Sequence, residues 1–234
     1  MRVEIWSDIM CPFCYIGKRK FEAALSEFEH SEDIQVVWKS FQLNPAMKTE
    51  PDKNIHQYLA EHKGVSLQEA SQMNEHVTAM AREVGLEYNF DKAVVANSFD
   101  AHRLIQLAKK HGKGDEAEER LFRAYFTEGA NIADRITLTK VGEEIGLAAI
   151  DIENMFKEGT FAREVKDDIR EAQQIGVRGV PFFVLDRKYG VSGAQPSEVF
   201  LSALTQAYEE AKPPQITPVN TASGDACDVD GNCE

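Results

Sequence analysis

Cysteine is scarce in this sequence: the 234 residues include four cysteines, and none stands between Cys14 and Cys227. So few cysteines exclude a small scaffold held together by a dense set of disulfides. The four form two close pairs, Cys11/Cys14 and Cys227/Cys233. In a reducing compartment, close pairs of this kind indicate either redox chemistry or a metal site.

Long apolar runs and positive charge are lacking as well. No run of about 18 apolar residues occurs, so we expect no membrane-spanning segment and no membrane partner. Lys and Arg total 26 against 39 Asp and Glu, a net charge of -13. This balance argues against nucleic acid as a partner, because nucleic-acid surfaces gather Lys and Arg. The opening residues Met1–Trp6 lack the apolar stretch of a secretory signal, which predicts a cytoplasmic protein.

The first forty residues have the pattern of two strands joined by a helix. Apolar and polar residues alternate up to about Ser7, which indicates a strand. Phe21, Leu25 and Phe28 then recur at helical spacing, and residues 34–41 are rich in β-branched and aromatic residues. A strand, a helix and a second strand in this order predict a βαβ unit with parallel strands.

Beyond residue 45 the pattern is helical as far as residue 176. Apolar stripes such as Met73, Val77, Met80 and Val84 recur at helical spacing, with little strand signal between them. We interpret the Met73/Met80 stripe as helix core and not as a cofactor-binding surface.

Strand character returns at residues 180–186, and a turn at Arg187-Lys188 leads to a short partner strand ending at Ser192. Pro196-Ser197 opens a last helix. The sequence therefore predicts an α/β fold of βαβ plus ββα with a large all-helical insertion. Residues 1–45 and 177–212 would form one domain, residues 46–176 the helical insertion domain, and residues 213–234 a flexible acidic tail with the second cysteine pair.

The segment Cys11-Pro12-Phe13-Cys14 follows the first strand directly and opens the first helix. Unpaired amides and a partial positive charge at a helix N-terminus stabilise a thiolate. Cys11 is therefore expected to be the exposed, ionised nucleophile, and Cys14 the sulfur that resolves a mixed disulfide. Pro12 suits the first helical turn, where its missing N–H is not needed. Two buried structural cysteines, or zinc ligands, are alternatives that this placement disfavours.

Several segments resemble the DsbA-like thioredoxin-fold proteins, in particular their FrnE-type cytoplasmic branch. These segments are Cys11–Gly17, Asn97–Leu104, Gly176–Pro181 and Ser192–Gln195. The resemblance implies a thioredoxin fold in which Pro181 is a cis-proline beside the cysteine pair. It also implies that Val180 and Pro181 meet the substrate chain, with Val180 acting through its apolar bulk, and that Pro12 and Phe13 influence the reduction potential.

The expected activity is that of a protein disulfide oxidoreductase acting on protein or small disulfide substrates. No organic cofactor and no metal are expected, because the cysteines hold the electrons; glutathione or a thioredoxin system would be a suitable reductant. The direction of electron flow stays open, since known pairs of this type span about −270 to −120 mV. The alternatives are a glutathione-dependent transferase or isomerase on the same scaffold, and a peptide-binding chaperone-like module.

Two further features have weaker interpretations. Cys227 and Cys233 enclose five residues with Gly231-Asn232, so they could form a local disulfide, exchange with Cys11/Cys14, or stay as free thiols. The spacing of acidic residues around them misses the EF-hand pattern. By resemblance His102 and Arg103 could line a substrate groove, but on a helix such residues are more often solvated or paired.

Overall fold

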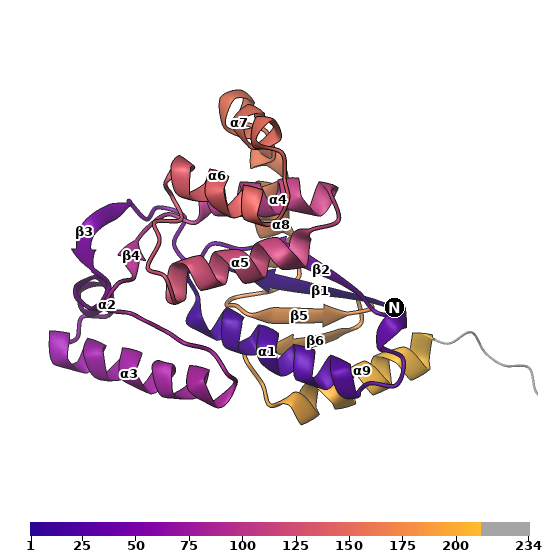
Figure 1. Cartoon of the computed structure of the whole chain (residues 1–234). Coiled ribbons are helices and arrows are strands. Elements are labelled where there is room, and N and C mark those ends of the chain that lie inside the picture. The colour runs from indigo at the N-terminus through magenta and orange to yellow at the C-terminus, as the bar shows by residue number, and fades with distance from the viewer. Residues whose placement is uncertain (212–234) are drawn as a thin grey trace, which may run out of the picture.

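The computed structural model describes residues 1–211, so the predicted tail with Cys227 and Cys233 lies outside the described residues. A four-stranded mixed sheet with strand order β2-β1-β5-β6 forms the centre of the fold (Figure 1). Strand β1 (Arg2–Ser7) pairs parallel to β2 (Gln35–Ser40) and antiparallel to β5 (Phe182–Leu185), which pairs with β6 (Tyr189–Ser192). The predicted βαβ unit and the terminal hairpin are confirmed.

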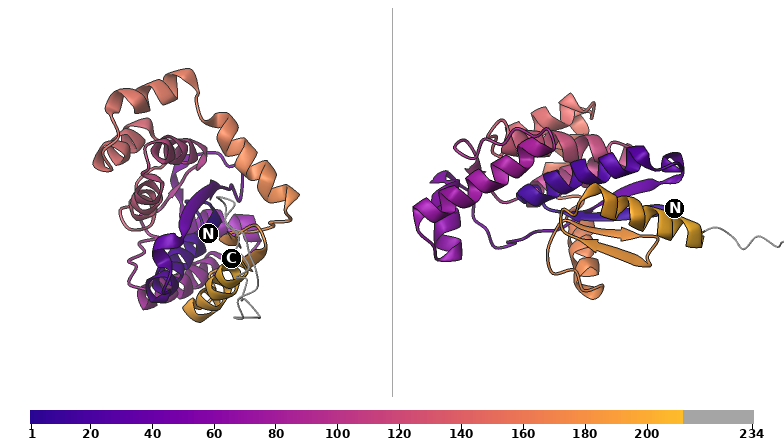
Figure 2. Two further views of the ribbon diagram at one scale, coloured as in Figure 1. Left: turned by 90° about the vertical axis from the view of Figure 1, so that its right-hand side faces the viewer. Right: turned by 90° about the horizontal axis from the view of Figure 1, so that it is seen from below.

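Helices cover both faces of this sheet (Figure 2). Helices α1 (Pro12–Glu27) and α9 (Ser197–Ala211) lie on one face, where Phe21 and Phe200 pack with Ile5 and Phe183 in one buried cluster. On the other face Trp6 packs with residues of the segment around α8 (Ala162–Gln174). All residues of β1 after Arg2 are buried, because the strand is covered on both sides.

The β5–β6 turn differs slightly from the prediction. Its two central residues are Asp186 and Arg187, with φ of 48° and 57°, and Lys188 N donates to Leu185 O at 3.0 Å. The predicted turn was centred on Arg187-Lys188, which is one residue closer to the C-terminus than the observed centre. Two consecutive positive φ values match the twist of a hairpin, and Asp tolerates the left-handed conformation better than most residues.

The insertion between β2 and β5 is helical, as predicted. Its helices are α2 (Ile55–Lys63), α3 (Leu67–Glu83), α4 (Phe99–Lys110), α5 (Gly114–Phe126), α6 (Arg135–Glu144), α7 (Ala149–Glu158) and α8. The short strands β3 (Glu50–Asn54) and β4 (Val94–Val95) form a two-stranded ribbon, and a 3-10 turn lies at Ser31–Asp33. No alternation predicts the ribbon, because β3 is charged, includes Pro51 and is largely exposed.

Helix α1 is shared between the sheet and the insertion. Cys14, Tyr15 and Ile16 are buried in one cluster with Leu121 and Phe122 of α5, and Tyr15 stacks on Phe122 with ring centroids 4.8 Å apart. The boundaries of the two predicted domains stay a prediction. Among the helices of residues 1–211, none combines the length and apolarity needed to cross a bilayer.

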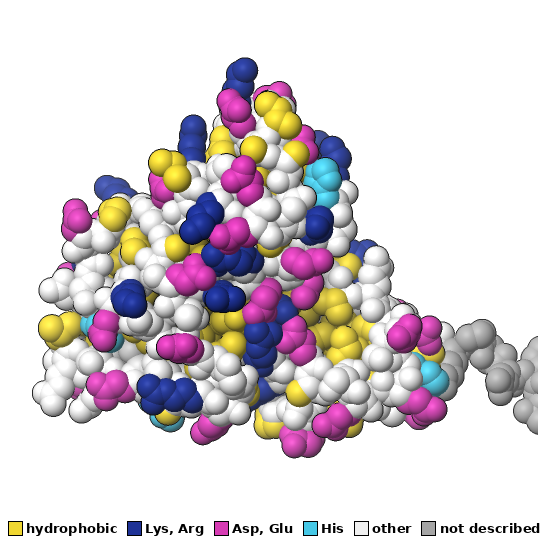
Figure 3. Space-filling view, viewed as in Figure 1, with side chains coloured by type: hydrophobic (Ala, Val, Ile, Leu, Met, Phe, Trp, Pro, Cys, Tyr) yellow, Lys and Arg dark blue, Asp and Glu magenta, His cyan; other side chains and the backbone are white. Residues whose placement is uncertain are grey.

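Ion pairs join α1 to α5. The Lys18 ammonium is buried and lies 3.3 Å from Asp115 and 3.2 Å from Glu119, and Arg19 also pairs with Glu119. Basic and acidic side chains are accordingly interspersed over this face of the molecule (Figure 3). Helix α1 is therefore held to the insertion by polar as well as apolar contacts.

Candidate active site

The pair Cys11/Cys14 lies at the N-terminus of α1, as the sequence predicts. Cys11 is the N-cap with an extended backbone (φ −89°, ψ 111°), and Pro12 follows in the first turn. Cys11 N donates to Asp8 O at 2.9 Å, and Cys14 N donates to Cys11 O at 3.0 Å. The Cys11 side chain does not cap the helix, and the first turn has no acidic residue. The positive end of the helix is therefore directed at the sulfurs without a competing carboxylate.

Cys11 is not the exposed residue that we expected. Cys11 is only 4% accessible to solvent, and its thiol donates a hydrogen bond to the main-chain carbonyl of Val180 at 3.5 Å. The prediction was wrong because the cover comes from the Val180 loop and from the insertion, which the local pattern does not reveal. Cys11 nevertheless borders a cavity that opens toward solvent.

Cys14 lies one turn further into the helix and is buried. Burial raises the pKa of its thiol well above the ordinary value of 9.0, and the hydrogen bond and charge of Cys11 raise it further. The Asp8 backbone and the Ser7 hydroxyl act in the opposite direction. Both cysteines are free thiols, so the structure represents the dithiol form.

The Val180–Pro181 peptide bond is cis, which confirms the prediction for Pro181. Gly17 allows this loop to lie directly against α1, because a Cβ added at Gly17 would lie 2.9 Å from Pro181 Cγ. Gly17 has no separate role in the predictions from the sequence. Its signal was present as a glycine in a helix interior, where it is unfavourable unless close packing requires it.

Tyr88 fixes the backbone between the two cysteines. Its buried hydroxyl donates to Pro12 O at 2.6 Å, and its ring stacks on Phe126 with centroids 4.6 Å apart. Burial, and then the nearby Cys11 and Cys14, raise the pKa of the Tyr88 hydroxyl, so it stays a proton donor. Nothing in the sequence identifies Tyr88, because its partner lies 76 residues earlier in the chain.

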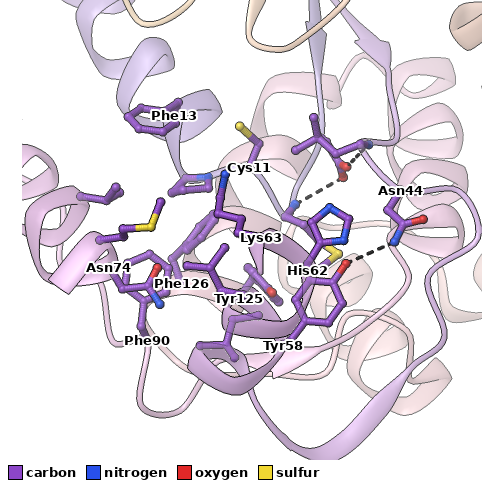
Figure 4. A pocket seen from close by; sticks show the side chains of 18 of the residues that line it. Cys11, Phe13, Asn44, Tyr58, His62, Lys63, Asn74, Phe90, Tyr125 and Phe126 are labelled. Atoms are coloured by element: carbon purple, nitrogen blue, oxygen red, sulfur yellow. Dashed lines mark hydrogen bonds between the residues drawn. The ribbon is translucent and has the colours of Figure 1, made fainter. Parts of the chain in front are cut away.

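A cavity of about 530 Å³ opens beside Cys11. Cys11, Pro12 and Phe13 form one wall, and α2 and α3 form the opposite side (Figure 4). The lining is mainly apolar and includes Met10, Met47, Ile55, Leu59, Met73, Val77, Phe90, Tyr125 and Phe126. Polar groups include Lys63, His62 and the pair formed by Asn44 Nδ2, which donates to Tyr58 OH at 3.2 Å.

Met73 is 39% exposed on the cavity side of α3, so its assignment to the helix core was wrong. The reason is that this end of α3 borders the cavity, whereas Met80 and Val84 further along the helix pack against the main hydrophobic cluster. Phe13, at 38% exposed, likewise presents its ring at the cavity wall.

A DSBA-like thioredoxin domain model matches residues 2–205 of the chain. The chain belongs to this DsbA-like family. A probable DsbA oxidoreductase, SCO1869 of Streptomyces coelicolor, is 39% identical, with 100% of this chain and 98% of that chain covered and a TM-score of 0.86. The uncharacterized protein YwbO of Bacillus subtilis (strain 168) is 28% identical over 210 residues, which are 88% of this chain and 96% of YwbO.

A second solved structure shares the fold at lower identity. The cytosolic disulfide reductase DsbM of Pseudomonas aeruginosa, solved with GSH, is 21% identical, with 89% of this chain and 100% of that chain covered and a TM-score of 0.64. Our narrower assignment to the FrnE-type branch stays a prediction.

His102 and Arg103 of this DsbA-like chain are buried, and neither lines the cavity. His102 Nε2 lies 3.4 Å from Asp8 Oδ1. Arg103 donates to Asp100 at 2.7 Å and to Thr160 O at 2.8 Å. Within residues 1–211, no three side chains of the His, Cys, Asp and Glu types are grouped to hold a metal ion.

Proposed function

We propose that this DsbA-like chain catalyses thiol–disulfide exchange, with Cys11 as the attacking sulfur and Cys14 as the resolving sulfur. The observation that carries the proposal is the position of two free thiols at an uncompensated helix N-terminus, beside a cis-proline and an apolar cavity. Such a helix end stabilises a thiolate, and a second thiol one turn away can displace the bound partner.

The exchange balances in two steps. The thiolate of Cys11 attacks a substrate disulfide, forms a mixed disulfide and releases the first substrate thiolate. Cys14 then attacks Cys11 Sγ, forms the Cys11–Cys14 disulfide and releases the second substrate thiolate. Two electrons pass from the cysteine pair to the substrate, and the same steps in reverse oxidise a substrate dithiol.

The substrate would lie in the cavity and along the Val180–Pro181 loop. Val180 presents its carbonyl to Cys11 at 3.5 Å, so a backbone or a small thiol bound there would meet main-chain polar groups next to apolar walls. Phe13 on the cavity wall would make an apolar contact with the substrate. Pro12 restricts the backbone conformation of the first turn of α1. The DsbM structure with GSH supports glutathione as a reductant of this pair, and its cytosolic description supports a cytoplasmic location.

The experiment that tests the proposal compares the full chain with Cys11→Ser and Cys14→Ser in the reduction of insulin by glutathione. We expect Cys11→Ser to abolish turnover and Cys14→Ser to accumulate a mixed disulfide that mass spectrometry detects. Turnover that survives Cys14→Ser would instead support a glutathione-dependent transferase or isomerase. Suppression of aggregation by the double variant, without reductase activity in the parent, would support a chaperone-like module.

We also propose that Cys227 and Cys233, outside the described residues, exchange with the Cys11/Cys14 pair. The Cys14→Ser chain provides the test, because it cannot close its own disulfide. A peptide linking Cys11 to Cys227 or Cys233 after redox cycling is the expected product. Its absence at every redox poise would leave the tail pair as a separate disulfide or as free thiols.

A further inference from the structure

A buried carboxylate borders the cavity beside Cys11, and the exchange mechanism above does not use it. Asp8 is only 1% accessible, yet it is among the residues that line the cavity. It stands three residues before Cys11, and the Cys11 N–H closes the turn between them by donating to Asp8 O at 2.9 Å. The carboxylate and the thiol therefore border the same cavity from within one turn of chain.

Main-chain groups hold the carboxylate of Asp8 in place. Its Oδ2 accepts from Leu43 N at 2.8 Å, and its Oδ1 accepts from Met10 N at 3.3 Å. His102 Nε2 lies 3.4 Å from Oδ1 without forming a hydrogen bond. A carboxylate offers about four acceptor positions, so Asp8 has the capacity to accept from further donors.

Asp8 differs from other buried carboxylates in lacking a cationic side chain beside it. Lys39 pairs with Glu4 at 3.9 Å and with Asp168 at 2.8 Å, whereas within residues 1–211 no Lys or Arg forms an ion pair with Asp8. Glu118 of α5 lacks such a partner too, but it does not line the cavity, and burial raises the pKa of its carboxyl to about 7. A buried charge is costly unless it is paired. For Asp8, a cation in the cavity would be such a partner.

Tyr125 of α5 is a second polar group of the cavity that has no partner. It is 2% accessible and lines the cavity, and its hydroxyl makes no hydrogen bond to any residue of 1–211. Figure 4 shows Tyr125 and Cys11 around the same hollow. Burial raises the pKa of the Tyr125 hydroxyl and the charge of Asp8 raises it further, so the hydroxyl stays protonated. A desolvated hydroxyl without a hydrogen bond is unfavourable, and a ligand in the cavity would supply the missing partner.

The segment after β2 brings another polar group to this part of the cavity. Leu43, whose N–H is held by Asp8, is followed by Asn44, and the Asn44 side chain donates to Tyr58 OH at 3.2 Å. Asp8 and Tyr58 are thus connected through two consecutive residues, and both line the cavity. A few polar groups converge here in a lining that is otherwise mainly apolar, which is typical of a site that orients a small ligand.

We propose that Asp8 and Tyr125 bind the ammonium group of a small disulfide whose sulfur then meets Cys11. This inference rests on the proposed exchange function and names its substrate class, which is the disulfide of a low-molecular-weight aminothiol. A primary ammonium has three donors, and the Asp8 carboxylate and the Tyr125 hydroxyl can accept two of them. Because Asp8 and Cys11 are separated by a single turn, the ammonium group should lie about two carbons from the sulfur.

The basic side chains at the cavity do not reverse this preference for a cation. Lys63, His62 and His76 line the cavity but are exposed, so water and salt screen their attraction for anions. Asp8 is buried, and the lower effective dielectric there strengthens its attraction for a cation. The net charge of -13 acts in the same direction. We therefore expect Asp8 to decide which charge is favoured beside Cys11.

The exchange with such a substrate balances without any change at the ammonium group. The Cys11 thiolate attacks one sulfur, the substrate S–S bond breaks, and the first aminothiolate leaves and takes a proton from solvent. Cys14 then attacks Cys11 Sγ, and the second aminothiolate leaves and gains a proton as Cys14 loses one. The cysteine pair gives up two electrons, the substrate disulfide takes them, and each ammonium group keeps its proton throughout.

The test compares three small disulfides of similar size on a full chain with Cys14→Ser, Cys227→Ser and Cys233→Ser, in which only Cys11 reacts. Cystamine is cationic, bis(hydroxyethyl) disulfide is neutral and dithiodipropionate is anionic. Acid quenching and mass spectrometry give the rate of mixed-disulfide formation. Each rate is divided by that of N-acetylcysteamine, a neutral free thiol, with the same disulfide, which corrects for intrinsic reactivity.

We expect the corrected rate with cystamine to exceed that with the neutral disulfide by roughly tenfold or more, the usual effect of a hydrogen bond to a charged group. Asp8→Asn keeps the shape of the side chain and removes its charge, so this preference should disappear. Tyr125→Phe should reduce the preference as well, and it keeps the proposal testable if Asp8→Asn does not fold. A merely structural role of either residue would slow all three disulfides by the same factor, so the ratio of rates is the decisive measurement.

Asp167→Asn is the matched control. It removes a negative charge from α8, where the side chain is 44% accessible and does not line the cavity. The preference for cystamine should be the same in this variant as in the parent.

Equal corrected rates for the three disulfides, or a faster reaction of dithiodipropionate, would overturn the ammonium site and leave the exchange function intact. A preference for cystamine that survives both Asp8→Asn and Tyr125→Phe would overturn it as well. If none of the three formed a mixed disulfide at Cys11, the exchange function would be wrong, and the substrate site with it.

Discussion

The hydroxyl of Tyr88 donates a hydrogen bond to the main-chain carbonyl of Pro12, at 2.6 Å, between the two cysteines of the pair. This contact joins the insertion to the turn of helix that carries both cysteines of the described residues. We therefore expect Tyr88→Phe to lower the free energy of unfolding by about 1 kcal/mol, the usual net contribution of a buried hydrogen bond. Urea unfolding measures the change.

Tyr58→Phe is the matched control, because it removes the same atom from a tyrosine at the cavity, where its partner is Asn44. Only Tyr88→Phe should also change the rate at which Cys11 reacts with iodoacetamide, since only Tyr88 contacts the backbone beside Cys11. Equal reactivity in the two variants would contradict a role for Tyr88 in holding this turn.

Gly17→Ala provides a test of the contact between α1 and the cis-proline loop. Helix propensity alone predicts stabilisation by about 1 kcal/mol. The added Cβ would lie 2.9 Å from Pro181 Cγ, so we expect destabilisation and slower disulfide exchange instead. Thermal unfolding and the insulin assay measure the two effects. A more stable protein with parental activity would show that the loop does not need to lie this close to the helix.

The raised pKa of Glu118 predicts a pH dependence of stability. Between pH 4.5, its ordinary pKa, and about 7, the folded protein keeps a proton that the unfolded chain releases. The free energy of unfolding should therefore fall as the pH rises through this window. Relative to Glu118→Gln, the parent should lose about 3 kcal/mol between pH 4.5 and 7.

Urea unfolding of both proteins at the two ends of this window checks the prediction. Glu116→Gln should show no such difference, because Glu116 is exposed. A constant difference between the parent and Glu118→Gln would show that the Glu118 carboxyl titrates alike in the folded and unfolded chains.

Asp168 joins α8 to the sheet through buried polar contacts. Its carboxylate accepts from Ser40 N at 3.0 Å, from Gln106 at 2.6 Å and from Lys39 at 2.8 Å. Asp168→Ala would leave these donors unpaired in the interior, so we expect a loss of roughly 3 kcal/mol or more in unfolding free energy. Asp167→Ala removes a neighbouring carboxylate whose side chain is 44% accessible, and it should change stability by less than about 1 kcal/mol. A similar loss of unfolding free energy in Asp168→Ala and Asp167→Ala would contradict the idea that the burial of Asp168 makes its contacts important for stability.

The parts of the fold that the sequence predicts are those with a strong local pattern. The alternation in β1, the helical spacing after Cys14 and the hairpin up to Ser192 each depend on neighbouring residues. The placement of the cysteine pair at a helix N-terminus follows from the same local order, and the family resemblance supplied the cis-proline. Local pattern thus accounts for the sheet, for α1 and for the position of the two sulfurs.

The rest depends on contacts between residues far apart in the chain. Tyr88 contacts the backbone between the two cysteines from the insertion, and no spacing rule connects it to Cys11 or Cys14. The same holds for the burial of Cys11, because its cover comes from Val180. The β3–β4 ribbon has no apolar alternation, so tertiary position and not sequence pattern decides its conformation.

The recessed position of Cys11 restricts which disulfides it can reach. Under the proposed function, a disulfide set in a rigid, convex protein surface would not reach Cys11 easily, because this residue is 4% accessible and is covered in part by the Val180 carbonyl. Low-molecular-weight disulfides, and cystines on slack or unfolded stretches of polypeptide, can thread into the hollow. Under the proposed exchange function, the burial of Cys11 would therefore favour flexible disulfide substrates over rigid ones, whatever their sequence.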